Sequence, residues 1–448
     1  MPSRRSTTLT LVAAGAVTLL GLTACSGQAS DEATASGPVT IDFWHAMSGP
    51  AATELDTLVD RFNTENDDGI TVKASFQGAY ADVQTKYTAS VQSGSTPDLL
   101  MMNDTSTGFM IDSQQTVPVS TFTADDDSFD PDAIAPAAAQ YYSGADGLAA
   151  MPFSVSMPVL YLNKALVAKA GLDVTDPPTT LDEVATWAEA IHAATGGYGM
   201  SMNMADSWML EELSASGGED FCTPDNGRGS DPVDGVSLTT DTQLDFMTRL
   251  QGLYQDGSAL NPGTDSAAQN SAFSSDRVGM LLTSSGAYTT VDPDGTKSVV
   301  ATFPTTADSA DAGQVIGGNA LWISGKGHSD AEQRASYEFA EWLQTPEVQA
   351  EWAKATGYLA MNTGAADTAV GKQSLTDPNV ATMYGQLADN ATSVAAAGCV
   401  TGAFPSVRAT VIGAFNQVVE GADVESTMAD AEKSAAKQIA SYNEAAGK

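Results

Sequence analysis

Short β-rich segments alternate with segments of helical periodicity from residue 39 onward. Candidates for strand, helix, strand, helix and strand follow one another at residues 39–43, 52–62, 70–76, 81–92 and 97–102. The first helical segment places Leu55, Leu58, Val59 and Phe62 on one face. Because helix-length segments separate the strands, this order predicts an α/β fold with a parallel sheet.

A second α/β block follows residue 151. Thr180 to Glu183 and Ser329 to Glu332 both read as capping boxes that open helices. Further strand candidates lie at residues 278–282, 299–303 and 315–324, and helical runs lie at 407–419 and 428–442. The order predicts two lobes, with the chain crossing between them more than once. Ligands of such sheets bind beyond the carboxyl ends of strands, in the crevice between the halves.

The N-terminus has the pattern of a secretory signal peptide over residues 1–24. Arg4 and Arg5 precede an apolar run from residue 9 to 22, which is too short to span a membrane comfortably. The sequence Leu22-Thr23-Ala24-Cys25 resembles a bacterial lipobox, which implies cleavage before Cys25 and lipidation of its thiol. The alternative is an ordinary signal peptide with an incidental cysteine. Residues 25–37 are expected to form the lipidated cysteine and a flexible tether.

The chain that follows the signal peptide is too long for one ordinary core, so we expect two domains. Residues 38–150 are expected to form the first part of lobe 1, and residues 151–310 to belong mainly to lobe 2. Residues 311–448 are expected to cross back between the lobes and to end in helices. The small polar stretch 217–235 reads as a loop.

The net charge of −37 bears on the possible partners. A surface this acidic repels phosphate backbones, so we expect no nucleic-acid partner. It also repels an anionic bilayer surface, so contact with the membrane would depend on the lipid at Cys25.

Cysteines and histidines bear on covalent and metal chemistry. Cys222 and Cys399 could form a disulfide outside the cytoplasm, or they could be two buried thiols. The three histidines lie far apart, and neither HExxH nor CxxC occurs, so we expect no metal and no cofactor. GxSxG and the Walker A loop are also missing, and with the lipobox this favours a binding protein over an enzyme.

Four segments carry a family resemblance: residues 43–49 (FWHAMSG), 151–164 (MPFSVSMPVLYLNK), 315–322 (VIGGNALW) and 355–359 (ATGYL). With these, the chain resembles the carbohydrate-type solute-binding lipoproteins of ABC importers, and within them the branch for sn-glycerol 3-phosphate and glycerophosphodiesters. The resemblance implies a two-lobed periplasmic-binding-protein fold with a hinge and an interlobe ligand cleft. It also implies a monomeric receptor at the extracytoplasmic face of the cell membrane, with ABC permease transmembrane subunits as partners and no catalytic activity.

The resemblance further implies a set of ligand contacts: Tyr80, Asp104, Ser156, Trp208, Ser284, Gly318, Tyr358 and Arg408. The guanidinium of Arg408 suits phosphate oxygens, and Asp104 would accept hydrogen bonds from glycerol hydroxyls. Ser406 could cap the helix that begins there, and the free backbone amides of that helix would then face the same phosphate. Ser156 and Ser284 would donate hydroxyls, and Gly318 would let the backbone approach the ligand closely.

Each of these residues has a structural alternative. Arg408 could be a surface arginine, the two serines could be satisfied strand ends, and the glycine pair at 317–318 could be a turn. The two tyrosines could be core edges, and Trp208 could be packing. Two other functions stay open: an oligosaccharide receptor of the same class, and a secreted glycosidase or phosphodiesterase.

Overall fold

A computed structural model of the chain describes residues 37–448, except 125, 127–128, 205–207, 307–308 and 310–311. The predicted signal peptide, Cys25 and the tether up to residue 36 lie outside the described residues. Among the residues that are described, no helix has the length and apolar character needed to cross a bilayer.

The first sheet has six strands: β1 (Val39–His45), β2 (Ile70–Phe76), β3 (Leu99–Asn103), β4 (Thr116–Val117), β7 (Met151–Ser156) and β15 (Gly317–Ser324). Strand β1 pairs in parallel with both β2 and β3. Helices α1 (Gly49–Glu65) and α2 (Tyr80–Ser93) make the connections, and the four apolar residues predicted on one face of α1 are buried. The predicted parallel βαβ arrangement is therefore present at this edge of the sheet.

The parallel arrangement expected from the first three strands ends at β3. Strand β15 runs antiparallel to β3, β4 and β7. The reason is the path of the chain, because β15 enters this sheet only after residues 158–302 have built another one. The sheet is therefore mixed, and its strands come from distant parts of the sequence.

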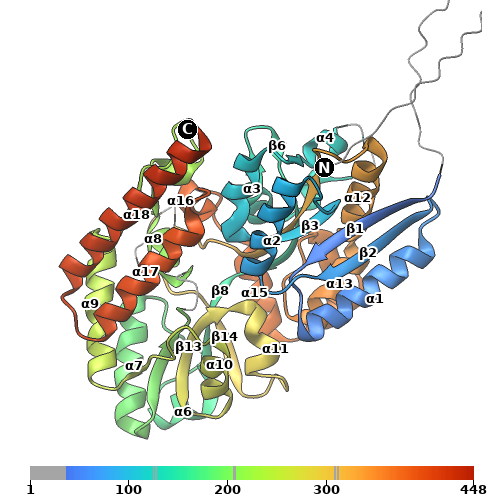
Figure 1. Cartoon of the computed structure of the whole chain (residues 1–448). Coiled ribbons are helices and arrows are strands. Elements are labelled where there is room, and N and C mark those ends of the chain that lie inside the picture. Colours follow the sequence, from blue (N-terminus) through green and yellow to red (C-terminus); the bar gives the residue numbers. More distant parts are fainter. Residues whose placement is uncertain (1–36, 125, 127–128, 205–207, 307–308, 310–311) are drawn as a thin grey trace, which may run out of the picture. The chain divides into compact units, whose positions relative to one another are not determined.

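The second sheet has five strands in the order β12 (Ala259–Leu260), β9 (Tyr198–Met202), β13 (Val278–Ser284), β8 (Pro158–Asn163) and β14 (Ser298–Thr302). Strand β9 is parallel to β12 and β13, whereas β8 is antiparallel to β13 and β14. Two sheets with helices packed on them give the two-lobed α/β fold (Figure 1).

The longer helices include α7 (Leu181–Thr195), α8 (Trp208–Gly217), α9 (Asp241–Gln255), α10 (Ser266–Ser274), α12 (Asp330–Trp342), α13 (Pro346–Thr356), α15 (Pro378–Ala388), α17 (Phe404–Val419) and α18 (Val424–Ala446). The shorter ones are α3 (Thr107–Ser113), α4 (Ser120–Thr123), α5 (Pro136–Tyr141), α6 (Lys164–Lys169), α11 (Tyr288–Val291), α14 (Ala369–Ser374) and α16 (Val394–Ala397). Both predicted capping boxes are present, with Thr180 opening α7 and Ser329 opening α12.

Two large hydrophobic cores lie in the described part of the chain, and the first also takes in side chains of the second sheet. The first contains the buried strand β3 and Trp322 of β15, together with Tyr141 at the end of α5. The second contains buried side chains of α7, α8, α9, α17 and α18. Helices α17 and α18 pack against each other at the red end of the chain in Figure 1. The C-terminal helices therefore belong with the second core.

His328 links the first sheet to the loop before α12. Its Nδ1 lies 2.7 Å from Oδ1 of Asp98, and its Nε2 lies 2.8 Å from the hydroxyl of Thr96. The other carboxylate oxygen of Asp98 accepts from the amide of Asp42 at 2.8 Å, which connects the pair to β1. The hydrogen bond to Asp98 raises the pKa of His328 above its ordinary value of 6.5.

This pair predicts a pH dependence of stability. Because the folded protein raises the pKa of His328, the pair stabilises fully below pH 6.5 and loses this contribution as the pH rises through the folded pKa. The free energy of unfolding of wild type should therefore exceed that of His328→Gln most at acidic pH, and the difference should shrink at alkaline pH. Urea denaturation of both proteins across this range measures it. A difference that grows with pH would contradict the assignment.

Candidate functional site

A polar cavity of about 280 Å³ lies where residues of both sheets meet. Its lining consists of Tyr80, Asn103, Asp104, Ser156, Asn203, Ser266, Asn270, Thr283, Ser284, Gly286, Ala287, Gly318 and Tyr358. Six of the eight ligand contacts expected from the sequence are in this lining, although they are spread over more than half of the chain. Trp208 and Arg408 are the other two.

The first lobe contributes residues that follow its parallel strands. Tyr80 begins α2 after β2, and Asp104 begins the short 3₁₀ helix η1 (Asp104–Ser106) after β3. The hydroxyl of Tyr80 accepts from Nδ2 of Asn319 at 2.9 Å. Burial raises the pKa of both Tyr80 and Tyr358, so each offers a neutral hydroxyl. This wall therefore combines one carboxylate with two phenols.

The second lobe contributes hydroxyl and amide groups. Ser284 ends β13, and its Oγ accepts from the amide of Gly286 at 3.1 Å, so its own proton can be directed at a ligand. Asn203 follows β9 and donates from Nδ2 to Oγ1 of Thr283 at 3.3 Å. Ser156, at the end of β7 in the first sheet, is buried and adds a hydroxyl from the first lobe. This wall can supply several hydrogen-bond donors to oxygen atoms.

Seven lining residues were not foreseen as ligand contacts from the sequence: Asn103, Asn203, Ser266, Asn270, Thr283, Gly286 and Ala287. Asn203 lies directly after β9, a strand that the sequence did not single out. A polar residue after a buried strand is the signal that could have found it, as for Asp104. Ser266 and Asn270 are four residues apart on α10, and nothing in their local sequence distinguishes them from surface residues.

Arg408 lies beside the cavity and reaches it through Asp104. Its side chain is only 5% exposed, so it is not a surface arginine. Nε lies 2.7 Å from Oε1 of Glu211, and Nη2 lies 3.6 Å from Oδ2 of Asp104. The guanidinium also packs over the ring of Phe404, with 4.9 Å between Cζ and the ring centre. The cation is therefore shared between two carboxylates, one of which lines the cavity.

The proposed cap at Ser406 is wrong. Helix α17 begins at Phe404, and its first turn contains Pro405, which has no amide hydrogen. Ser406 lies inside that turn and donates its hydroxyl to the carbonyl of Ala403 at 2.7 Å. Proline in the first helical turn therefore marks the start of the helix better than the serine does.

Trp208 packs in the second core, which was its structural alternative, and Gly318 has a packing role that the sequence did not reveal. Trp208 is buried at the start of α8, and a Cβ on Gly317 would lie 3.2 Å from its ring. Gly318 is in a strand and not a turn, with φ of +138°, and a Cβ there would overlap the carbonyl oxygen of Ser154. Glycine is required at this position because the backbone of β15 lies very close to the neighbouring strand β7.

A second cavity of about 260 Å³ shares Tyr358 with the first. More than half of its lining residues are small or apolar, and apart from Tyr288 of α11 they come from α13, α14 and α15 and the segments between them. A smaller share of its lining side chains can form hydrogen bonds than in the cavity at Asp104. We therefore place the candidate site at the polar cavity.

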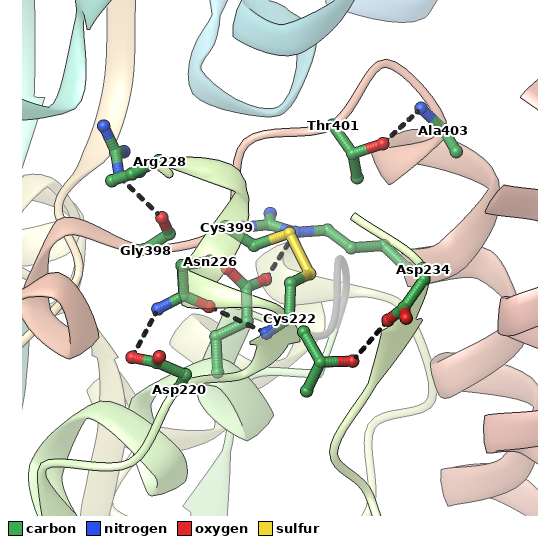
Figure 2. The surroundings of a disulfide bond; sticks show 12 residues. Asp220, Cys222, Asn226, Arg228, Asp234, Gly398, Cys399, Thr401 and Ala403 are labelled. Carbon is green, nitrogen blue, oxygen red and sulfur yellow. Dashed lines mark hydrogen bonds and ion pairs between the residues drawn. A yellow bond between two sulfur atoms is a disulfide. The ribbon is translucent and has the colours of Figure 1, made fainter. Parts of the chain in front are cut away.

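The sulfurs of Cys222 and Cys399 form a disulfide that connects the start of β10 (Cys222–Thr223) with the segment before α17. The stretch expected as a loop between residues 217 and 235 also contains β11 (Gly235–Val236), which pairs with β10. Figure 2 shows the cystine with Asn226 and Arg228 beside it. The disulfide thus fixes a long-range contact nine residues before Arg408.

The sequence matches known families over most of its length. Residues 57–382 match the family described as bacterial extracellular solute-binding protein. The chain is 31% identical over 353 residues to the sn-glycerol-3-phosphate-binding periplasmic protein UgpB of Pectobacterium atrosepticum, covering 76% of this chain and 78% of that protein. It is also 31% identical over 344 residues to UgpB of Escherichia coli K12, covering 74% and 76% of the two chains.

Solved structures are similar to this fold at lower identity. UgpB of Mycobacterium tuberculosis in complex with glycerophosphocholine has a TM-score of 0.74 at 21% identity and covers 91% of this chain and 99% of that one. The cyclic α-maltosyl-1,6-maltose binding protein of Arthrobacter globiformis has a TM-score of 0.71 at 22% identity and covers 90% and 99%. With its two-sheet fold, its cavity and these relatives, the chain belongs to the family of bacterial extracellular solute-binding proteins.

Proposed function

We propose that this protein is the lipid-anchored, extracytoplasmic receptor of an ABC importer and binds sn-glycerol 3-phosphate or a glycerophosphodiester such as glycerophosphocholine. The observation that carries the proposal is the gathering of Tyr80, Asp104, Ser156, Ser284, Gly318 and Tyr358 around one polar cavity. The UgpB relatives, named for sn-glycerol 3-phosphate or solved with glycerophosphocholine, support the same ligand class.

The size and chemistry of the cavity support a small phosphoester. Its volume of about 280 Å³ lies just below the ~300–1,000 Å³ range of drug-sized ligand pockets. Hydroxyl and amide groups from Ser156, Ser284 and Asn270 can donate to phosphate oxygens, and Asp104 can accept from glycerol hydroxyls. Arg408 is placed to stabilise the negative charge that Asp104 and a phosphate would bring together.

One observation favours an oligosaccharide as the alternative ligand. Arg408 already contacts the carboxylates of Glu211 and Asp104, and this arrangement would also suit a neutral polyol that hydrogen-bonds to Asp104. Solved sugar-binding proteins share the fold as well. In this alternative Arg408 would orient Asp104 and would not contact the ligand.

Calorimetric titration of the purified protein separates these candidates. Glycerol 3-phosphate, glycerophosphocholine, maltose and trehalose would be titrated in turn under the same buffer and salt. We expect heat of binding with at least one phosphoester and none with either disaccharide. Binding of a disaccharide without binding of any phosphoester would replace the proposal by the sugar-receptor alternative.

The lipid anchor predicts a separate result for Cys25. In Cys25→Ala, lipid labelling and globomycin-sensitive processing should be lost, because no thiol is left at the lipobox position to accept the lipid. The protein should then leave the membrane fraction. Ser26→Ala, a change at the next residue, should leave labelling and partitioning unchanged. A Cys25→Ala protein that still labels and still sediments with membranes would rule out the anchor.

A further inference from the structure

The loop that contains Cys222, residues 220–228, holds the segment at residues 394–400 by more than the disulfide. Asn226 is fully buried, and its side-chain Nδ2 donates to the carbonyl of Val394 at 3.0 Å. The backbone carbonyl of Asn226 accepts from the amide of Val400 at 2.9 Å. Arg228 donates to the carbonyls of Gly398, at 2.9 Å, and Ala397. Figure 2 shows Asn226 bonded to the amide of Cys222 and Arg228 bonded to the carbonyl of Gly398, the residue before Cys399.

Arg228 extends this contact to the first lobe. Nη1 donates to the carbonyl of Gln140 at 3.0 Å, and Cζ lies 5.2 Å from the ring centre of Tyr141. Both residues end α5, and Tyr141 belongs to the first core, whereas both cysteines belong to the second. Burial lowers the pKa of Arg228 to about 10, so it is still charged at neutral pH. One arginine therefore connects α5, residues 397–398 and the cystine loop through backbone carbonyls.

The held segment leads directly into the candidate site. Thr401 follows Val400 directly, and its backbone lies against Gly108 of α3. A Cβ on Gly108 would overlap the carbonyl carbon of Thr401, so α3 packs directly on this backbone. Helix α3 follows η1, which begins at Asp104. Helix α17 begins at Phe404, and Arg408 is little more than one turn further on. The same short stretch thus positions both partners of the Arg408–Asp104 pair.

We propose that the cystine loop, through Cys222–Cys399 and Arg228, is a positioning element of the ligand site that holds Arg408 against Asp104. Arg228 is in this sense a positioning residue and does not touch the ligand. The ligand class rests on the proposed function, but the holding of Arg408 against Asp104 by the cystine loop does not. Coupling of this kind travels through packed side chains and hydrogen bonds that share one backbone segment.

The test compares two changes in the loop with two controls. Cys222→Ala/Cys399→Ala removes the cross-link, and Arg228→Met removes the donors but keeps an unbranched apolar stem. Thr223→Val is the local control, because Thr223 bonds to the exposed Asp234 at 2.9 Å and not to residues 394–400. Leu250→Ala, in the second core, is the control for lost stability alone.

Two readouts apply to each protein well below its melting temperature. The first is hydrogen exchange of residues 404–412 without ligand, and the second is the Kd for glycerophosphocholine by calorimetry. In both loop variants we expect faster exchange and a Kd weakened by roughly 3- to 30-fold, the range for residues that act through a packed network. Thr223→Val should match wild type, and Leu250→Ala should lower the melting temperature without changing the Kd.

The outcomes separate this inference from the proposed function. Loop variants with a lower melting temperature but unchanged exchange and unchanged Kd would reduce the loop to a stabilising element and overturn the inference. If wild type binds no phosphoester, the proposed function fails, while the exchange of residues 404–412 still decides on positioning. In an Asp104→Asn background the loop changes should no longer weaken the Kd, because the pair that they position is already broken.

Discussion

Arg408→Ala should weaken binding of glycerophosphocholine by roughly one and a half to three and a half decades, because truncation at a buried charged contact costs about 2–5 kcal/mol. It should also lower the free energy of unfolding by about 3–5 kcal/mol, since Glu211 is only 1% exposed and loses the cation 2.7 Å away. Titration calorimetry measures the first effect, and urea denaturation measures the second.

Three further variants keep the two effects apart. Arg408→Ala/Glu211→Gln should recover stability without recovering affinity, because it removes the buried charge but restores no cation. Arg408→Lys should rescue binding only in part, since a point charge cannot replace the planar guanidinium. Arg249→Ala removes an arginine from the exposed pair with Glu189 and should cost about 1 kcal/mol or less. A folded Arg408→Ala protein with wild-type affinity for the phosphoesters would refute the phosphate assignment and favour the sugar receptor.

The sequence predicts strand segments and helix caps well, because each depends on residues that are close together in the chain. Strand β2 was predicted with its observed bounds, and both capping boxes open helices where the Thr or Ser and the Glu predicted them. The start of α17 was missed for an equally local reason. Proline in the first turn, here Pro405, is a stronger signal for the start of a helix than the nearby Ser406.

Long-range features could not be read in this way. The antiparallel direction of β15 depends on where the chain re-enters the first sheet, and no pattern within the strand encodes that path. The ion pair of Arg408 with Glu211 joins α17 to α8, which is almost two hundred residues earlier in the sequence. The expected ligand contacts came from a family resemblance, and only the three-dimensional arrangement shows that six of them line one cavity.

Gly318→Ala should lower the free energy of unfolding by about 2–6 kcal/mol, the sum of backbone strain and overpacking. Gly318 has φ of +138°, a conformation that alanine rarely adopts, and the new methyl group would overlap the carbonyl oxygen of Ser154. The new methyl group and the carbonyl oxygen of Ser154 cannot move apart easily, because Gly318 pairs with Val155 in the ladder between β15 and β7. Urea denaturation measures the loss.

The same change should weaken ligand binding, because the strands that must separate carry Ser156 and Gly318 into the polar cavity. Gly385→Ala is the matched control, since a Cβ at that position in α15 meets no atom within 4 Å. Alanine in a helix interior should there raise stability by about 0.5–1 kcal/mol and leave affinity unchanged. If Gly318→Ala unfolded at the wild-type midpoint, β15 and β7 would not approach each other at Gly318 as closely as described. The placement of Ser156 in the cavity depends on that approach and would then have to be abandoned.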